Sequence, residues 1–599
     1  MIYHCEDHTC NYWDEGEKLP ERCPQCGRKL LRANEADMTG DDWTALGNTL
    51  WYAEASDKKR MVDCFRKAAY LGSAWGVCNL GICMEQGNGV EADPVQAFWL
   101  YQQAVEMGSL NAVCCLGVCY QYGIGTAPDA EKAAELYCKA AEYGSPRGQM
   151  LLARAFHDGI GVEADAAEAV HWVRAAAYQR YGEGMHRLGV CYEYGDGVEQ
   201  NWEHAVHWFR EAAESGVSVA MTDLGYCYEK GCGVEQSWEQ AFSWYRRGAE
   251  CGYPVSMSNL GLCYKRGYGV EQNWQEAIKW YEQGAQCGDL QSMHNLACCY
   301  ERGEGVEQNE ERALYWYRRS AEGGNGVAMC NLGWCYQRGY GVEQNEDRAL
   351  YWYRRGAEAG SVYCMFYLGW NYSNGVGVKQ NMTEAIRWYT AAAEGGNADA
   401  MHNLGWHYDH GEGVEQDMKK AICWYERAAE QNHPAAMNSL GECYAMGRGV
   451  PRDLETAMEW YRRAAELGEA MADYNMGWHL EQAGKLSEAY AHYRKAADGN
   501  DDSAWWALGR FYENGVVVAQ DGKEARRCYE TGEKLGSVKC KMRLARCKLL
   551  GIGGRRAKKA GLDLCRQALE LAKESSEKED YGYEAEMNLL RRTIAENES

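Results

Sequence analysis

The sequence has little proline and no long hydrophobic run. Only 8 Pro stand against 68 Gly in 599 residues. Abundant Gly without Pro argues against a disordered chain and favours a turn that recurs. No stretch approaches the ~18 uninterrupted apolar residues of a membrane-spanning helix. The N-terminus, MIYHCEDHTCNYW, lacks a basic start followed by an apolar run. We therefore expect no signal peptide and a cytoplasmic protein.

Positive charge is also scarce. Lys and Arg number 63 against 87 Asp and Glu, which gives a net charge of −24. A negative chain repels nucleic acids and anionic membranes, so neither is an expected partner. We expect instead a protein or peptide partner with a basic or mixed-charge surface. Because no export signal is present, the 28 Cys are interpreted as mostly reduced thiols.

A 36-residue repeat dominates the chain. The segment NLGWCYQRGYGVEQ at 331–344 recurs as LGYCYEKGCGVEQ from Leu224 and as LGLCYKRGYGVEQ from Leu260. One shortened step at each end extends the series to about fifteen units. The small residue after Leu occurs every 36 residues at Gly81, Gly117, Ala153, Gly189, Gly225, Gly261, Ala297, Gly333, Gly369, Gly405, Gly441 and Gly477. A Trp row has the same spacing, at Trp172, Trp208, Trp244, Trp280, Trp316, Trp352, Trp388, Trp424 and Trp460.

Each unit is predicted to contain two helices. In 328–338, apolar residues at i, i+3, i+4 and i+7 predict a first helix, and Gly339 ends it because Gly accepts a left-handed conformation. Asn345 is a good N-cap for the second helix. A helix-interior Gly costs ~1 kcal/mol, so its recurrence at Gly333 predicts a close approach of two helices. The expected core residues are Met329, Leu332, Gly333 and Tyr336 of the first helix and Ala349, Trp352, Tyr353 and Ala357 of the second.

No unit can bury both of its helices alone, but stacked units can. The expected fold is therefore all-α, a right-handed α/α solenoid of about fifteen helix pairs with a concave and a convex surface. A small metal-binding β ribbon is expected to precede it. The predicted organisation is the metal-binding module over 1–32, a linker over 33–40, the solenoid over 41–553, and C-terminal capping helices with a polar tail over 554–599.

The repeat pattern resembles a known family. A-x-x-x-L-G-x-x-Y-x-x-G-x-G-V followed by A-x-x-W-Y-x-x-A-A-E-x-G is similar to the Sel-1-like repeat, a relative of the tetratricopeptide repeat. The resemblance covers roughly Asp41 to Gly553. It implies a protein–protein interaction scaffold or adaptor, without enzymatic activity. Secreted, cysteine-rich relatives have a proposed β-lactam-binding activity, which we do not expect in a chain without an export signal.

A second stripe runs along each first helix, opposite the core stripe. Asn331, Trp334 and Arg338 lie at i, i+3 and i+7. If the first helices line the concave surface, as the resemblance implies, the stripe faces a groove that binds a partner, because Trp and Arg are frequent binding hot spots. Alternatively, these residues pack between neighbouring first helices, or Arg complements the helix dipole. The predicted groove residues are Asn259, Arg266, Asn295, Arg302, Asn331, Trp334, Arg338, Trp370, Asn403 and Trp406.

A Cys row follows the same register. Many units carry one Cys beside the Tyr of the first helix, and we interpret it as a small buried hydrophobic residue. Equivalent thiols in adjacent units are expected to lie roughly 10 Å apart, too far for a disulfide. The row consists of Cys83, Cys119, Cys191, Cys227, Cys263, Cys299, Cys335 and Cys443.

The N-terminus carries a different pattern. Cys5, Cys10, Cys23 and Cys26 lie in YHCEDHTC and PERCPQCG. The C-P-Q-C-G turn lets two thiolates reach one ion, and four Cys ligands indicate a closed, structural site for zinc, with iron as the alternative. The first pair is spaced C-x4-C, so His8 could replace Cys5 as a ligand. The segment resembles the rubredoxin-like knuckle of bacterial zinc ribbons.

Enzymatic motifs are missing from the sequence. It has no P-loop, no G-x-S-x-G, no H-E-x-x-H and no dinucleotide fingerprint. We therefore expect a non-enzymatic scaffold that binds a protein or peptide in the groove. An alternative is a regulator whose metal ribbon contacts nucleic acid while the solenoid recruits proteins.

Overall fold

The computed structural model describes 2–5, 13–15, 30–33, 35–51, 55–578 and 583–598. It comprises two units, 1–309 and 310–599, and each is treated by itself. Three short strands form an antiparallel sheet in the order β2-β1-β3, with Ile2 opposite both Glu15 and Ala33. These strands are β1 (Ile2–Cys5), β2 (Trp13–Glu15) and β3 (Leu30–Ala33), and the short 3-10 helix η1 (Glu35–Asp37) follows.

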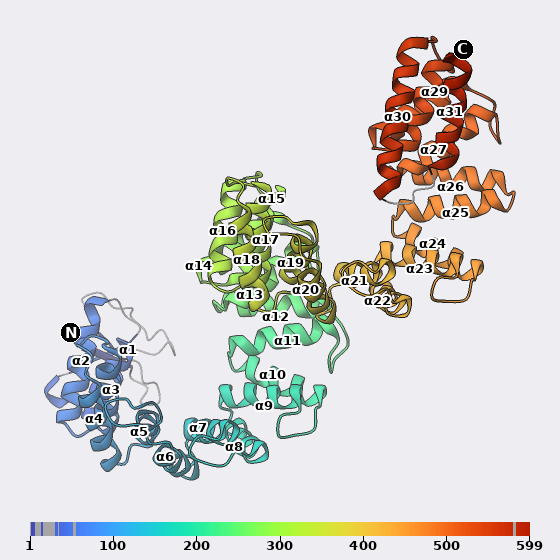
Figure 1. The fold of residues 1–599 in the computed structure, drawn as a ribbon. Helices are drawn as coiled ribbons and strands as arrows, with labels where there is room; N and C mark the ends of the chain where they lie inside the picture. Colours follow the sequence, from blue (N-terminus) through green and yellow to red (C-terminus); the bar gives the residue numbers. More distant parts are fainter. Residues whose placement is uncertain are drawn as a thin grey trace. The chain divides into compact units, whose positions relative to one another are not determined.

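Thirty-one α-helices make up nearly all of the rest of the described chain, and within each unit they follow one another as antiparallel pairs (Figure 1). The helices of the first unit are α1 (Gly40–Thr49), α2 (Ala55–Tyr70), α3 (Ala74–Gln86), α4 (Pro94–Glu106), α5 (Leu110–Tyr122), α6 (Ala130–Glu142), α7 (Pro146–Asp158), α8 (Ala166–Tyr178), α9 (Gly182–Tyr194), α10 (Trp202–Glu214), α11 (Ser218–Lys230), α12 (Trp238–Glu250), α13 (Pro254–Arg266), α14 (Trp274–Gln286) and α15 (Leu290–Arg302).

The second unit begins with α16 and ends with two longer helices, α30 and α31. Its helices are α16 (Glu310–Glu322), α17 (Gly326–Arg338), α18 (Glu346–Glu358), α19 (Val362–Asn374), α20 (Met382–Glu394), α21 (Ala398–His410), α22 (Met418–Glu430), α23 (Pro434–Met446), α24 (Leu454–Glu466), α25 (Ala470–Gln482), α26 (Leu486–Asp498), α27 (Asp502–Asn514), α28 (Gly522–Lys534), α29 (Val538–Leu550), α30 (Lys558–Lys578) and α31 (Glu584–Glu598). None of the described helices is long and apolar enough to span a membrane.

The pair α17/α18 shows how the repeat sequence specifies its helix ends. Gly339 adopts a left-handed conformation, with φ of 70°, and its N–H donates to the carbonyl of Cys335. Gly341 is also left-handed, with φ of 64°. The Asn345 side chain accepts a hydrogen bond from the Arg348 N–H at 2.9 Å, which satisfies a donor at the start of α18. The predicted Gly terminator and Asn N-cap are therefore confirmed.

The core of the pair α17/α18 is built around one aromatic ring. Tyr353 of α18 is fully buried, and a Cβ added at Gly333 of α17 would lie 2.6 Å from the Cε1 atom of its ring. Gly recurs here because the ring of the second helix lies directly against the first helix, which gives a physical reason for the predicted close approach. The Tyr353 hydroxyl donates to Gln337 Oε1 at 3.0 Å. The ring therefore joins the two helices by both packing and a hydrogen bond.

The Cys row is buried as predicted. Cys335 is 0% exposed and Cys227 is 1% exposed, and the other six members of the row are buried too. Burial raises the pKa of the Cys263 thiol to about 12, so it stays protonated and unreactive at neutral pH. All described cysteines from Cys64 to Cys565 are free. This row is part of the core.

Candidate partner-binding face

The stripe predicted on α17 is partly buried at one end and exposed to solvent at the other. Asn331 and Trp334 are half-buried and Arg338 is exposed. The Trp334 ring centroid lies 5.7 Å from that of Tyr340, in the turn that follows the helix. The stripe thus presents an aromatic edge, an amide and a cation on the first-helix face, by which we mean the side of the first helices that carries this stripe.

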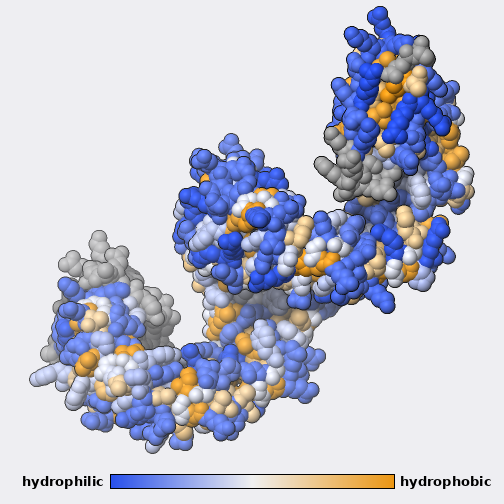
Figure 2. Space-filling view, in the orientation of Figure 1, coloured by the Kyte–Doolittle hydropathy of each residue, from blue (hydrophilic) through white to orange (hydrophobic). Residues whose placement is uncertain are grey.

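In the next two repeats, the Trp residues at the position of Trp334 differ in exposure. Trp370 of α19 packs partly against the hydrophobic core. Trp406 of α21 is 36% exposed, and its ring stacks on His410 at 4.3 Å between centroids. Asn403 of the same helix is half-buried. In Figure 2 a hydrophobic patch surrounded by hydrophilic residues is visible around α20 and α21. Trp406 is therefore the most accessible of the predicted Trp residues.

The stripe of the first unit contains both packing and exposed residues. Asn295 of α15 accepts from Gln291 Nε2 at 3.0 Å and donates to Ser258 Oγ of α13 at 3.5 Å. This amide connects neighbouring first helices, as the packing alternative predicts. Asn259 is half-buried and Arg266 is exposed. The Arg302 side chain is 62% exposed, and its Nη1 lies 3.9 Å from Glu304 Oε1.

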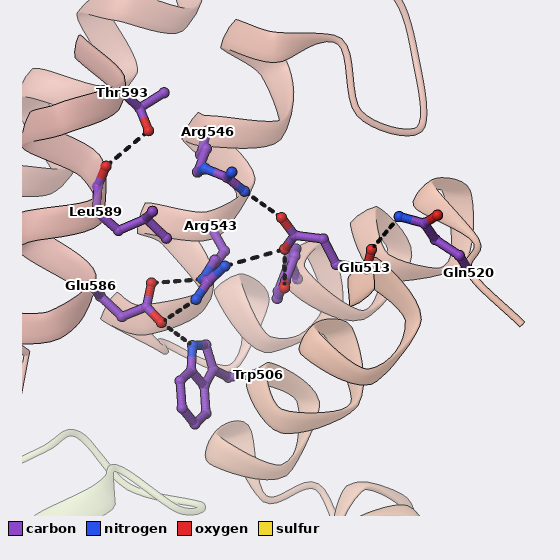
Figure 3. A network of polar contacts seen from close by, with 9 residues as sticks. Trp506, Glu513, Gln520, Arg543, Arg546, Glu586, Leu589 and Thr593 are labelled. Carbon is purple, nitrogen blue, oxygen red and sulfur yellow. Dashed lines mark hydrogen bonds and ion pairs between the residues drawn. The ribbon is translucent and has the colours of Figure 1, made fainter. Parts of the chain in front are cut away.

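The chain's own last helix occupies this face at the C-terminal end. Arg543 of α29 holds the repeat position that Asn331 holds in α17. Its Nη2 donates to Glu586 Oε1 of α31 at 2.7 Å, and Trp506 Nε1 of α27 donates to the same oxygen at 3.2 Å (Figure 3). Glu513 of α27 lies on the other side of Arg543, with 3.4 Å between Oε2 and Nη1, and also accepts from Arg546. A buried carboxylate of one helix is thus held by an Arg and a Trp of two first helices.

Sequence reasoning missed further exposed residues on this face. Trp478 of α25 is 40% exposed and continues the series of Trp334, Trp370 and Trp406 after one interruption. Met446 of α23 is 65% exposed at the repeat position of Arg338. The 36-residue spacing could have identified Trp478, which lies two repeat lengths after Trp406.

The predicted metal ligands cannot be placed. Cys10, Cys23 and Cys26 lie outside the described residues, as do the alternative ligand His8 and the side chain of Cys5. Among the residues that the structure does describe, no group of three or more His, Cys, Asp or Glu side chains is arranged to hold a metal ion.

These helix pairs define an α-solenoid, and comparison with known proteins identifies its class. A crystal structure of a protective antigen present in uropathogenic Escherichia coli strains, which displays an SLR fold, is 32% identical over 75% of this chain and 97% of that chain, with a TM-score of 0.50. A Sel1 repeat protein from Oxalobacter formigenes is 33% identical over 41% of this chain and 96% of its own, with a TM-score of 0.38. No curated protein sequence matches.

The family model described as Sel1 repeat matches most of the chain, so the protein belongs to the Sel1 repeat family. The matched residues are 76–109, 112–145, 146–181, 182–217, 218–253, 254–289, 290–325, 326–361, 362–397, 398–433, 434–469, 470–501 and 504–537.

Proposed function

We propose that the protein is a non-enzymatic scaffold that binds a protein or peptide partner along its first-helix face. The contact of Glu586 with Arg543 and Trp506 carries this proposal, because it seats a helix of the same chain on two first helices, and Arg543 holds the repeat position of the half-buried Asn331. Trp406 and Arg338 supply the residue types that dominate binding energies at interfaces. The free, buried thiols support action in the reducing cytoplasm.

The charges favour a partner with a mixed surface. The net charge of −24 attracts basic groups. The exposed guanidinium groups of Arg266, Arg302 and Arg338 pair with carboxylates on the partner, in the way that Arg543 pairs with Glu586. A partner segment that alternates acidic and basic residues satisfies both requirements.

Substitution of Trp370 and Trp406 tests the proposal. Trp370→Ala with Trp406→Ala should abolish the capture of partners by the full chain, measured by affinity purification and mass spectrometry, while far-UV circular dichroism stays unchanged. Because Trp370 packs partly in the core, Trp406→Ala alone is the second variant, and it should weaken capture with no loss of helicity. Tyr315→Ala with Tyr351→Ala is the matched control, since these rings are 52% and 53% exposed on second helices. Equal capture by all variants would refute the proposal.

We also propose that Cys5, Cys10, Cys23 and Cys26 hold one structural zinc ion. The C-P-Q-C-G turn supports this assignment, since four thiolates form a closed tetrahedral site. Elemental analysis of the full chain should find one zinc per chain, and Cys23→Ser with Cys26→Ser should remove it. A red protein that contains iron would contradict the choice of metal, and a metal-free wild-type protein would contradict the site.

A further inference from the structure

Two positions break the row of buried rings. The ring position of Tyr353 is filled by Tyr or Phe at thirteen of its fifteen occurrences along the chain, by Val173 in α8 and by Cys565 in α30, the second helix of the last pair. Val173 is itself buried, at 3% exposure, so the second helix α8 does not turn its side chain away from the core. The row consists of Phe65, Tyr101, Tyr137, Val173, Phe209, Tyr245, Tyr281, Tyr317, Tyr353, Tyr389, Tyr425, Tyr461, Tyr493, Tyr529 and Cys565.

The missing ring leaves a cavity. A space of about 280 Å³ lies among α7, α8 and α9. An apolar cavity of about 150 Å³ is large enough to bind benzene, so this space accepts a six-membered ring. Burial raises the pKa of the lining Cys191 thiol to about 11, so the wall there is neutral. The apolar lining consists of Met150, Ala153, Ala169, Val170, Val173 and Cys191.

Polar groups surround the mouth of the cavity. His157 lies between two carboxylates, with Nδ1 at 2.6 Å from Asp158 Oδ1 and Nε2 at 3.3 Å from Asp196 Oδ2. Arg154 Nε lies 3.3 Å from Asp158 Oδ2, and Arg187 Nη2 lies 3.7 Å from Asp196 Oδ2. All five side chains are between 32% and 63% exposed, so the mouth is open to solvent. Glu183 also lines the cavity, so three carboxylates face two guanidinium groups, which disfavours an anionic ligand.

The polar residues at the mouth occupy the place where other pairs have the hydrogen-bond acceptor of the ring hydroxyl. In several other pairs the ring hydroxyl donates to a Glu or Gln of the first helix, as Tyr101 does to Glu85 Oε2 at 2.6 Å and Tyr245 does to Glu229 Oε2 at 2.9 Å. His157 occupies this Glu position in α7, and it brings the carboxylates of Asp158 and Asp196 to the same place. A phenol in the cavity therefore finds acceptors for its hydroxyl.

We infer that this cavity binds a tyrosine side chain of a protein partner, which fills the place of the ring that the repeat lacks. The tyrosine comes from a partner protein, because the mouth of the cavity opens on the first-helix face. Arg187 holds the repeat position of Asn331 there, and Arg154 holds that of Trp334. The inference rests on the proposed function, since it adds a specificity pocket to the same binding face.

Ligand-observed nuclear magnetic resonance of the full chain tests this assignment. The probes are N-acetyl-L-tyrosinamide, which represents a tyrosine within a chain, N-acetyl-L-phenylalaninamide, which lacks the hydroxyl, and p-cresol, which lacks the backbone. The tyrosinamide should give saturation transfer, and its affinity should exceed that of the phenylalaninamide several-fold. Val173→Tyr, which restores the ring, should weaken tyrosinamide binding at least tenfold.

Two further variants keep the test decisive. If Val173→Tyr disturbs folding, Ala153→Gly with Val173→Tyr restores the complete Gly–Tyr pairing and should show the same loss of binding. Asp158→Ala with Asp196→Ala leaves the cavity open, removes both acceptor carboxylates and should remove the preference for the hydroxyl. Phe209→Tyr is the matched control, because the next pair already contains a ring that is 1% exposed, and it should bind the tyrosinamide like the wild type.

Three outcomes would overturn the inference. They are undiminished binding by Val173→Tyr, equal affinity for the phenylalaninamide and the tyrosinamide, and binding of p-cresol without binding of the tyrosinamide, which would indicate a site for small phenols. The Trp406 capture experiment concerns the second unit and a different readout. A failure of the pocket can therefore be distinguished from a failure of the scaffold.

Discussion

The pairs α7/α8 and α17/α18 have the same backbone plan but different interiors. In α17/α18 the ring of Tyr353 lies against Gly333 and donates its hydroxyl to Gln337. In α7/α8 the corresponding residues are Ala153, Val173 and His157, and a cavity remains between the helices. The two pairs differ by a few side chains, and one has a filled core while the other has a pocket.

The difference shows how a repeat protein can open a cavity in its core. Each pair is supported by its neighbours, so one pair can lose a ring while the array stays folded. A single-core domain has no such support, and an unfilled cavity there reduces the stability of the whole fold. Departure from the repeat at a core position is therefore informative, because the thirteen copies that carry a ring show what is absent.

The largest expected effect comes from removing the ring in α17/α18. Tyr353→Ala should destabilise this pair by about 3–5 kcal/mol, because it empties a filled core and leaves the amide of Gln337 without its hydroxyl partner. Val173→Ala in α8 should cost only about 1.5 kcal/mol, since it removes two methyl groups at ~0.8 kcal/mol each. Native-state hydrogen exchange of peptides from each pair measures both values locally. Equal costs at the two sites would mean that α7/α8 is as well packed as α17/α18.

The intermediate effect comes from filling the cavity. Val173→Tyr should stabilise α7/α8 by about 1–2 kcal/mol, as cavity-filling substitutions commonly do. The same hydrogen-exchange measurement reports it as slower exchange in α7 and α8. Phe209→Tyr adds a hydroxyl to a pair that already holds a ring, and it should change exchange in its own pair by much less. Faster exchange in the Val173→Tyr variant would show that the space is too small or too rigid for a ring.

The sequence predicted most of the helix pair in advance. Gly339 and Asn345 determine helix ends through backbone conformation and capping, which are local effects, and Leu332 and Cys335 follow the helical period. Prediction of the binding stripe was less complete. Whether Asn295 contacts Ser258 or a partner depends on the distance between neighbouring first helices, and the sequence does not contain that distance.

The cavity was readable only in part. The change to Val173 is visible in the sequence as a break in the aromatic row. Whether neighbouring side chains close the space depends on packing. Met150 and Val170 line the cavity without filling it, a result that needs coordinates.

The smallest expected effect is a pH dependence of stability that α7/α8 shows and α17/α18 does not. The hydrogen bond from His157 lowers the pKa of Asp158 below its ordinary value of 3.8. A carboxyl group whose pKa is lower in the folded state than in the unfolded state stabilises the fold at any pH above its unfolded-state pKa. This stabilisation is lost as the pH falls through the folded-state pKa. Asp158→Asn should therefore destabilise α7/α8 by less than ~1 kcal/mol at pH 6, since both groups are partly exposed, and this effect should shrink steadily as the pH falls below 3.8 and through the folded-state pKa. In α17/α18 the residue at the position of His157 is Gln337, which does not titrate, so Gln337→Glu is the matched variant that introduces a carboxylate beside Tyr353. Hydrogen exchange over a series of falling pH values measures the difference, and an Asp158→Asn effect that does not shrink with pH would show that the side chain acts by packing instead of charge.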